Sequence, residues 1–330
     1  MPAVMKLTVK LESLPYARPF VIARGAFTHC DVLVVELEDG SHCGRGEAVP
    51  NRRFAQSPEG ERQALERLRP QIEAGLTREE LRHLMPARSG RNALDCALWD
   101  LEAKKSGNSA WALAGLTPPP GPLLIDVTLS ILEPEAMAAA ARERADFELL
   151  KVKLGKDAPM ERIRAVRQAR PDARLMVDAN EAWEIDELKA YAPQLQELGV
   201  EFIEQPLKRG FDDALMDYEC PLPLAADESC HLPGDMEHLA ALYDYINIKL
   251  DKTGGLTEAL LVAKAAQAHG LGLMVGCNGG TSLAMAPAFL VASLCEYRDL
   301  DGPLLLKEDR QPAMACVEGH LSPFSSTLWG

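Results

Sequence analysis

Short apolar runs typical of buried strands recur through the second half of this 330-residue chain, and each ends in an ionisable side chain. The five side chains are Lys153, Asp178, Glu204, Asp227 and Lys249, at intervals of 25, 26, 23 and 22 residues. One strand, one helix and two loops need about that much chain. Because the carboxyl ends of the strands of a β/α barrel meet at one mouth, the spacing predicts that the five groups surround a single cavity.

The segments between the strand runs carry apolar residues at helical intervals, as at Met160, Ile163 and Val166. Alternating strands and helices are typical of a parallel sheet, so the predicted fold class is α/β with a barrel. Residues 121–131 are expected to form its first strand and 271–277 a later one. The last strands are expected around 298–306.

The first part of the chain has a different pattern. Strand-like runs meet at a turn of Glu38, Asp39 and Gly40, which is typical of an antiparallel hairpin. Helical segments are predicted at 59–73, 78–84 and 90–105. The proline-rich TPPPGP at 117–122 cannot continue a helix, so it is the expected linker. The predicted domains are an α+β capping domain at 1–118, a barrel at 119–306, and a tail at 307–330 that packs on the capping domain.

Composition excludes several classes of partner. A net charge of -14 argues against nucleic acid and against an anionic membrane. Eight cysteines without a CxxC pair, and a start without a signal-peptide pattern, predict reduced thiols in a cytoplasmic protein. The longest apolar run, 283–295, is too short to span a membrane and contains Pro287, so a buried helix is expected there.

Three carboxylates on consecutive strands predict a metal site. Asp178, Glu204 and Asp227 offer hard oxygen ligands and leave positions open for water and substrate, which suits Mg²⁺. The alternative is that they are solvated acids at strand ends. Three such acids in succession, with lysines on either side, favour the metal site.

The lysines suggest proton transfer. Lys151 and Lys153 are two apart in one strand and share a face, and Lys249 is expected across the mouth from Lys153. A divalent cation and a second ammonium would lower the pKa of such a lysine, so that it acts as a base. Bases on opposite faces of one carbon would deprotonate either hand of a substrate. The alternative is that the lysines are only counter-ions to the acids.

Five motifs at these intervals resemble the enolase superfamily, in its muconate-lactonizing subgroup with a lysine on each face. They are KVK at 151–153, VDAN at 177–180, IEQP at 203–206, ADES at 226–229 and NIKLDKTGG at 247–255. RNALDCALWDLEAKKSG at 91–107 is similar to the capping-domain helix of that superfamily. The resemblance implies a modified TIM barrel, (β/α)7β, under an α+β cap, and Mg²⁺ that stabilises an enediolate between two lysines.

Two further motifs are similar to those of dipeptide epimerases. The resemblance of DLDGP at 299–303 implies that Asp299 and Asp301 hold the free ammonium of a dipeptide, and FVIARG at 20–25 implies that Arg24 contacts an acidic side chain. It also implies that Lys151 adds positive charge at the substrate carboxylate and that Thr128 contacts substrate. Asn278, in GCNGG, stands where related epimerases more often have an apolar group, which leaves the dipeptide preference open beyond an acidic bias.

The expected function is therefore Mg²⁺-dependent epimerisation at the α-carbon of the C-terminal residue of a small dipeptide, Ala-Glu of murein peptide metabolism. An alternative on the same scaffold is o-succinylbenzoate synthesis or cycloisomerisation, which needs no ammonium-binding aspartates. A non-catalytic binding protein on a decayed barrel is an alternative of another class. The sequence leaves the oligomeric state open, a homo-oligomer included.

Overall fold

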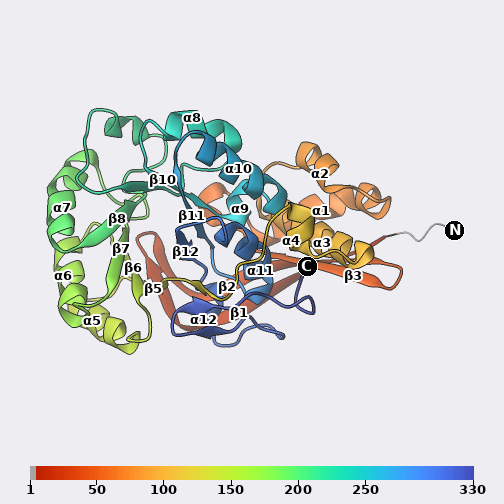
Figure 1. Ribbon diagram of the computed structural model, residues 1–330, viewed down its shortest axis with the longest axis horizontal. Helices are drawn as coiled ribbons and strands as arrows, with labels where there is room; N and C mark the ends of the chain where they lie inside the picture. The colour runs from red at the N-terminus through yellow and green to blue at the C-terminus, as the bar shows by residue number, and fades with distance from the viewer. Residues whose placement is uncertain (1–4) are drawn as a thin grey trace.

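The computed structural model describes residues 5–330, which form a β/α barrel and an antiparallel sheet with its own helices (Figure 1). The barrel sheet has eight parallel strands in chain order. They are β5 (Val127–Leu129), β6 (Leu149–Lys153), β7 (Arg174–Asp178), β8 (Val200–Glu204), β9 (Leu224–Ala226), β10 (Tyr245–Ile248), β11 (Gly272–Gly276) and β12 (Tyr297–Asp299). The backbone N–H of Asp126 donates to the carbonyl of Arg298 at 3.0 Å and so joins the two ends of the sheet.

Helices and short 3-10 turns connect these strands, and one helix, α12, follows the last strand. They are α5 (Pro134–Glu143), α6 (Pro159–Ala169), α7 (Ile185–Glu197), η2 (Asp212–Leu215), η3 (Pro233–Asp235), α8 (Met236–Leu239), α9 (Leu250–Thr253), α10 (Leu256–Ala268), α11 (Ser282–Ala292) and α12 (Gly302–Leu305). In Figure 1, α5, α6 and α7 lie along the outer side of the strands. The predicted apolar stripe of α6 is buried, and α11 is the buried helix expected at 283–295. No helix within residues 5–330 is long and apolar enough to cross a membrane.

The strand register sets the ionisable groups side by side. Lys153 of β6 pairs with Asp178 of β7, and Asp178 pairs with Glu204 of β8. Glu204 pairs with Ala225 of β9, so Asp227 lies two residues farther toward the mouth. Side chains of a strand alternate between its faces, so the shared register directs neighbouring groups toward one another.

The capping region is a three-stranded antiparallel sheet with helices on one side. Its elements are β1 (Lys6–Ile22), β2 (Gly25–Asp39), β3 (His42–Ala48), η1 (Arg52–Phe54), α1 (Pro58–Glu73), α2 (Arg78–Leu84), α3 (Ser89–Ser106) and α4 (Ala110–Ala114). The β2–β3 hairpin and the first three helices confirm the predicted elements. Helix α3 lies so close to β3 that a Cβ at Gly44 or Gly46 would collide with the carbonyls of Ala97 and Ala93.

Two strand predictions are wrong in detail. The run 121–131 is divided: β4 (Leu123–Leu124) pairs with β14 (His320–Leu321), which pairs with β13 (Cys316–Val317), and only Val127–Leu129 enters the barrel. The stretch 298–306 supplies one strand, β12, and then α12, which begins at Gly302 with Pro303 in its first turn. Proline favours that position because it has no N–H to leave unpaired.

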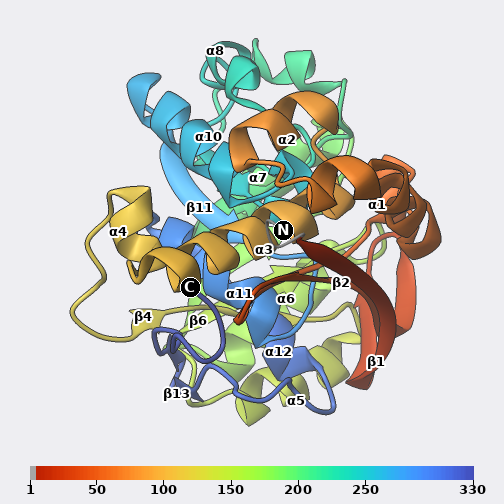
Figure 2. The ribbon, with the colours of Figure 1, turned by 90° about the vertical axis from the view of Figure 1, so that its right-hand side faces the viewer.

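The C-terminal residues contact α3, beside which Figure 2 shows the chain ending. The indole Nε1–H of Trp329 donates to the carbonyl of Cys96 at 3.0 Å, and the backbone N–H of Gly330 donates to Asp100 at 2.7 Å. The domain boundaries themselves, 1–118, 119–306 and 307–330, stay a prediction.

Candidate active site

A cavity of about 680 Å³ lies between the mouth of the barrel and the β1–β2 hairpin. Six of the ten predicted site residues line it: Arg24, Thr128, Lys153, Lys249, Asp299 and Asp301. The other four, Lys151, Asp178, Glu204 and Asp227, are at most 2% exposed. A smaller hollow of about 410 Å³ against α2 and α3 contains none of them, so the chemistry belongs to the larger cavity.

Asp178, Glu204 and Asp227 form one cluster. Each offers a carboxylate oxygen within 4.8 Å of the others. Oε2 of Glu204 is buried without a hydrogen bond from residues 5–330, although Nζ of Lys151 lies 2.6 Å away, outside hydrogen-bond geometry. Buried carboxylates are unfavourable unless cations compensate them. Three oxygen donors with an unused lone pair among them fit a hard divalent cation such as Mg²⁺.

Lys153 and Lys249 contact opposite ends of this cluster. Nζ of Lys153 donates to Asp178 at 2.5 Å, and Nζ of Lys249 donates to Asp227 at 2.8 Å. Glu204 lies on the strand between those two acids. Two amines therefore approach one carboxylate cluster from its two ends.

The pKa of Lys249 is shifted by its surroundings. Burial disfavours its charged form, but the attraction of Asp227 outweighs burial and raises the pKa above its usual value. The sequence predicted a lowered pKa for such a lysine beside a bound divalent cation. That lowered pKa stays a prediction for the metal-bound site.

Sequence reasoning missed three side chains that orient the acids. Nζ of Lys252 donates to Asp227 at 2.6 Å, and the amide of Asn247 donates to Glu204 at 2.8 Å. The amide of Asn180 donates to Asp178 at 3.1 Å. Strand alternation could have found Asn247, which lies on β10 two residues before Lys249, the residue that follows the strand. Asn180 and Lys252 are inside the VDAN and NIKLDKTGG motifs but had no assigned role.

Lys151 does not line the cavity. Its fully buried Nζ lies 2.6 Å from Glu204 and donates to Asp299 at 2.6 Å, which links the carboxylate cluster to the opposite side of the barrel. Burial opposes the charge on Lys151, yet Asp299 and Glu204 raise its pKa well above the usual value. Its contacts are therefore with other carboxylates of the protein and not with the open space where a substrate carboxylate is expected.

Asp299 and Asp301 both line the cavity. A carboxylate oxygen of Asp301 accepts the backbone N–H of Thr128 at 2.7 Å. Burial and the neighbouring charge of Asp299 raise the pKa of Asp301 to about 7. Behind them, both oxygens of Asp126 are buried without a hydrogen-bond partner among the described residues, and burial raises its pKa well above the usual value. This acidic region is suited to a bound cation.

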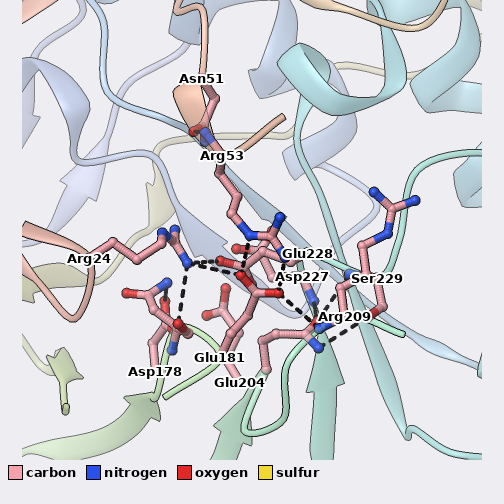
Figure 3. Close-up of polar contacts among 12 residues, drawn as sticks. Arg24, Asn51, Arg53, Asp178, Glu181, Glu204, Arg209, Asp227, Glu228 and Ser229 are labelled. Carbon is pink, nitrogen blue, oxygen red and sulfur yellow. Dashed lines mark hydrogen bonds and ion pairs between the residues drawn. The ribbon is translucent and has the colours of Figure 1, made fainter. Parts of the chain in front are cut away.

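Arg24 lies in the turn between β1 and β2 and reaches over the carboxylate cluster (Figure 3). Its Nη1 donates to Glu228 at 2.7 Å. Arg53 of η1 makes a two-pronged ion pair with Glu181, with both nitrogen–oxygen distances at 2.6 Å. Burial and the charge of Asp227 raise the pKa of Glu228 to about 7. Two arginines of the capping region thus contact acids at the barrel mouth.

Asn278 also lines the cavity, near Asn51 of the capping region. Its side-chain carbonyl accepts a hydrogen bond from the amide of Asn51 at 3.4 Å. Its own amide nitrogen is buried without a partner among residues 5–330. The cavity therefore presents a polar group at this position.

Comparison of the sequence with known families gives two matches. Residues 5–115 match the N-terminal domain of mandelate racemase and muconate lactonizing enzyme, and residues 135–323 match the enolase C-terminal domain-like family. The L-Ala-D/L-Glu epimerase of Escherichia coli K12 is 45% identical over 95% of this chain and 99% of its own length. The N-acetyl-D-glutamate racemase of a Pseudoalteromonas species is 41% identical over 91% of this chain and 95% of its own length.

Solved structures are similar over nearly the whole chain. An enolase family member from Agrobacterium tumefaciens with homology to dipeptide epimerases, solved with sodium and L-Ala-L-Glu, has a TM-score of 0.96 and 46% identity; the match covers 99% of this chain and 100% of that one. A dipeptide epimerase from Methylococcus capsulatus, solved with Mg and L-Arg-D-Lys, has a TM-score of 0.89 and 32% identity, with 98% of each chain covered.

Proposed function

This chain belongs to the mandelate racemase and muconate lactonizing enzyme family of the enolase superfamily, and from that premise we propose that it is a dipeptide epimerase. The reaction inverts the α-carbon of the C-terminal residue of a dipeptide, with Ala-Glu as the favoured substrate. One observation carries the proposal: Lys153 and Lys249 line one cavity and contact the two outer acids of a single carboxylate cluster.

Asp178, Glu204 and Asp227 would hold Mg²⁺, the cation found with the Methylococcus capsulatus relative. When bound, the ion supplies positive charge beside the substrate carboxylate, where negative charge develops after the α-proton leaves. Lys153 or Lys249 takes that proton, and the opposite lysine returns one to the other face. Lys252 and Asn247 keep the acids oriented through their hydrogen bonds.

Asp299 and Asp301 would bind the free ammonium of the dipeptide, with Thr128 beside them. The buried, partly uncompensated carboxyl groups of Asp301 and Asp126 support this assignment, because a substrate cation would relieve their repulsion. Arg24 would contact the acidic side chain of the second residue. The Escherichia coli relative is named for Ala-Glu epimerisation, and the Agrobacterium structure holds L-Ala-L-Glu.

The relative from Pseudoalteromonas suggests a second candidate, the racemisation of an N-acetylated glutamate. That reaction needs the same lysines and metal but brings no ammonium. The acidic region around Asp301 favours the dipeptide. Cycloisomerisation and o-succinylbenzoate synthesis lack the ammonium as well, and a non-catalytic protein would exchange no protons at all.

The test is α-proton exchange in D₂O, followed by NMR, with L-Ala-L-Glu and N-acetyl-L-glutamate under equal Mg²⁺. We expect deuterium in the Glu residue of the dipeptide, formation of the D-epimer, and a higher kcat/KM for the dipeptide. A higher kcat/KM for N-acetylglutamate would overturn the dipeptide assignment and leave the two-lysine chemistry standing. No exchange with any small acid would favour the non-catalytic alternative.

Two coarser assignments complete the proposal. The chain is divided into a capping domain at 1–118, a catalytic barrel at 119–306 and a tail at 307–330 that packs on the capping domain. A cytoplasmic location is supported by the eight cysteines, all of which are free thiols.

A further inference from the structure

Arg24 is held by only one of its three side-chain nitrogens. Nη1 donates to Glu228 at 2.7 Å and to the backbone carbonyl of Asn180 at 3.2 Å, and lies 3.4 Å from Glu181. Within residues 5–330, Nε and Nη2 make no hydrogen bond. The side chain is 29% exposed and lines the cavity. One edge of the guanidinium is therefore fixed by the protein, and the other is available to a ligand.

The groups that hold Nη1 are themselves fixed (Figure 3). Side chains of Glu228 and Glu181 are 3% and 6% exposed. Glu181 also binds Arg53 through both carboxylate oxygens and accepts the backbone N–H of Arg209 at 2.9 Å. Asn180 and Glu181 have φ values of +45° and +67°, a backbone conformation that is unfavourable for non-glycine residues and persists where surrounding contacts enforce it.

The free edge of Arg24 is the same edge with which Arg53 binds a carboxylate. Arg53 contacts Glu181 with Nε and Nη2, each at 2.6 Å. The same pair of nitrogens on Arg24 has no protein partner. A planar guanidinium binds a carboxylate best along such an edge, through two parallel hydrogen bonds.

We propose that Glu228 is a positioning residue for substrate selection, which holds Nη1 of Arg24 so that Nε and Nη2 face the acidic side chain of the substrate. The inference rests on the proposed function. It adds Glu228 of the barrel, as a second specificity determinant, to Arg24 of the capping region. Three acceptors converge on Nη1 alone, so Glu228 acts as an anchor of Arg24 and not as a competitor for the substrate carboxylate. An unanchored arginine in a hairpin turn would lose more rotamer freedom on binding.

The test measures kcat/KM for Ala-Glu and for Ala-Leu at saturating Mg²⁺, and compares the Glu/Leu ratio in wild type, Arg24→Met, Glu228→Gln and the double variant. We expect each single variant to lower the ratio roughly tenfold, as for a lost charge-assisted contact. The Glu/Leu ratio of the double variant should be no lower than that of Arg24→Met, because both changes disrupt the same pair of residues. An unchanged or increased ratio in Glu228→Gln would overturn the anchor, and an increase would identify Glu228 as a competitor.

Arg24→Lys tests the two-edge arrangement of Arg24 and leaves Glu228, the neighbour of Asp227, unchanged. A lysine held by Glu228 keeps the charge but has no second edge, so the ratio should fall as in Arg24→Met. A wild-type ratio in Arg24→Lys would overturn the two-edge arrangement. The control is Glu143→Gln, which removes an exposed ion pair between β1 and α5, Arg18 to Glu143 at 2.7 Å, and should leave the ratio unchanged.

Failure of the proposed function gives a different result. If wild type has no activity on Ala-Glu, or shows no preference for it over Ala-Leu, both proposals fall. If Arg24→Met lowers the ratio and Glu228→Gln does not, the acidic preference stands and only the role of Glu228 is wrong.

Discussion

Asp95 of α3 caps the first turn of α10 by binding Thr257 twice. One carboxylate oxygen accepts the backbone N–H of Thr257 at 2.9 Å, and the other accepts its hydroxyl at 2.6 Å. The two residues are 162 positions apart and join the capping region to the barrel. Neither residue lines the cavity, so we expect their contact to bear on stability and not on the reaction.

Asp95 should make stability depend on pH. Burial raises its pKa to about 6 from 3.8, a difference that corresponds to roughly 3 kcal/mol. The folded state then binds the proton more tightly than the unfolded state. Its contribution is fully present below pH 4 and is lost as the pH rises through about 6. Urea unfolding between pH 4 and 7 should show a shallower decline for Asp95→Asn than for wild type.

The control for this prediction is Asp217→Asn, an exposed acid just after η2, which should keep the wild-type slope. Equal slopes in wild type and Asp95→Asn would show that the burial of this carboxyl does not control stability in that range.

Removal of the metal should stop the reaction. Chelation is expected to abolish turnover and Mg²⁺ to restore it, because three buried carboxylates converge on one point. Glu204→Gln should weaken Mg²⁺ binding more than about tenfold in calorimetry, since an amide loses the charge attraction. Asp172→Asn, which alters an exposed acid paired with Arg170, should bind Mg²⁺ as wild type does. Full activity in excess chelator, with no bound metal, would show that these three carboxylates are not a catalytic metal site.

The two lysines should separate the two stereochemical faces. Lys153→Ala is expected to stop epimerisation but to leave α-proton exchange of one substrate epimer, and Lys249→Ala should leave exchange of the other. The reason is that each amine contacts a different end of the carboxylate cluster. NMR in D₂O with each pure epimer provides the measurement. Interconversion of both epimers at the normal rate in either variant would exclude a two-base mechanism.

Asp301 should matter only for substrates with a free ammonium. Asp301→Asn removes one partner of a charge-assisted contact, which costs about 1.5 to 3 kcal/mol, or roughly ten- to a hundredfold in kcat/KM for Ala-Glu. An N-acylated analogue has no ammonium to lose, so its kcat/KM should change much less. An equal loss of kcat/KM for both substrates would show that Asp301 supports the structure of the barrel and does not bind the substrate ammonium.

Much of the barrel and its acids could be predicted from sequence because both depend on local patterns. Strand runs, helical spacing and the position of each charge at a strand end define Lys153, Asp178 and Glu204, and the parallel topology then brings them together. One strand error arose where a segment pairs with a distant one, and the other arose where a short helix, α12, follows β12. β4 joins β14 nearly 200 residues later, a contact that no periodicity encodes.

The contacts of Arg24 could not be predicted for the same reason. Its partner Glu228 is 204 positions away, and Glu181 is 157 away. A motif identified Arg24 as a residue near substrate, but only the position of the cap over the barrel mouth reveals what holds it. The role of Lys252 was not predicted because it depends on α9, a helix of four residues that places the Lys252 ammonium against Asp227.

The strand register also determines which segments of such a chain tolerate insertions and substitutions and which do not. A one-residue insertion within β7 would turn Asp178 away from Lys153 and Glu204, whatever the quality of the loops around it. Arg24 and Asn278, by contrast, lie outside the barrel strands, in a hairpin turn and a loop. Descendants of this protein could therefore acquire new substrates by changing a few exposed segments, while the proton-transfer apparatus is inherited intact.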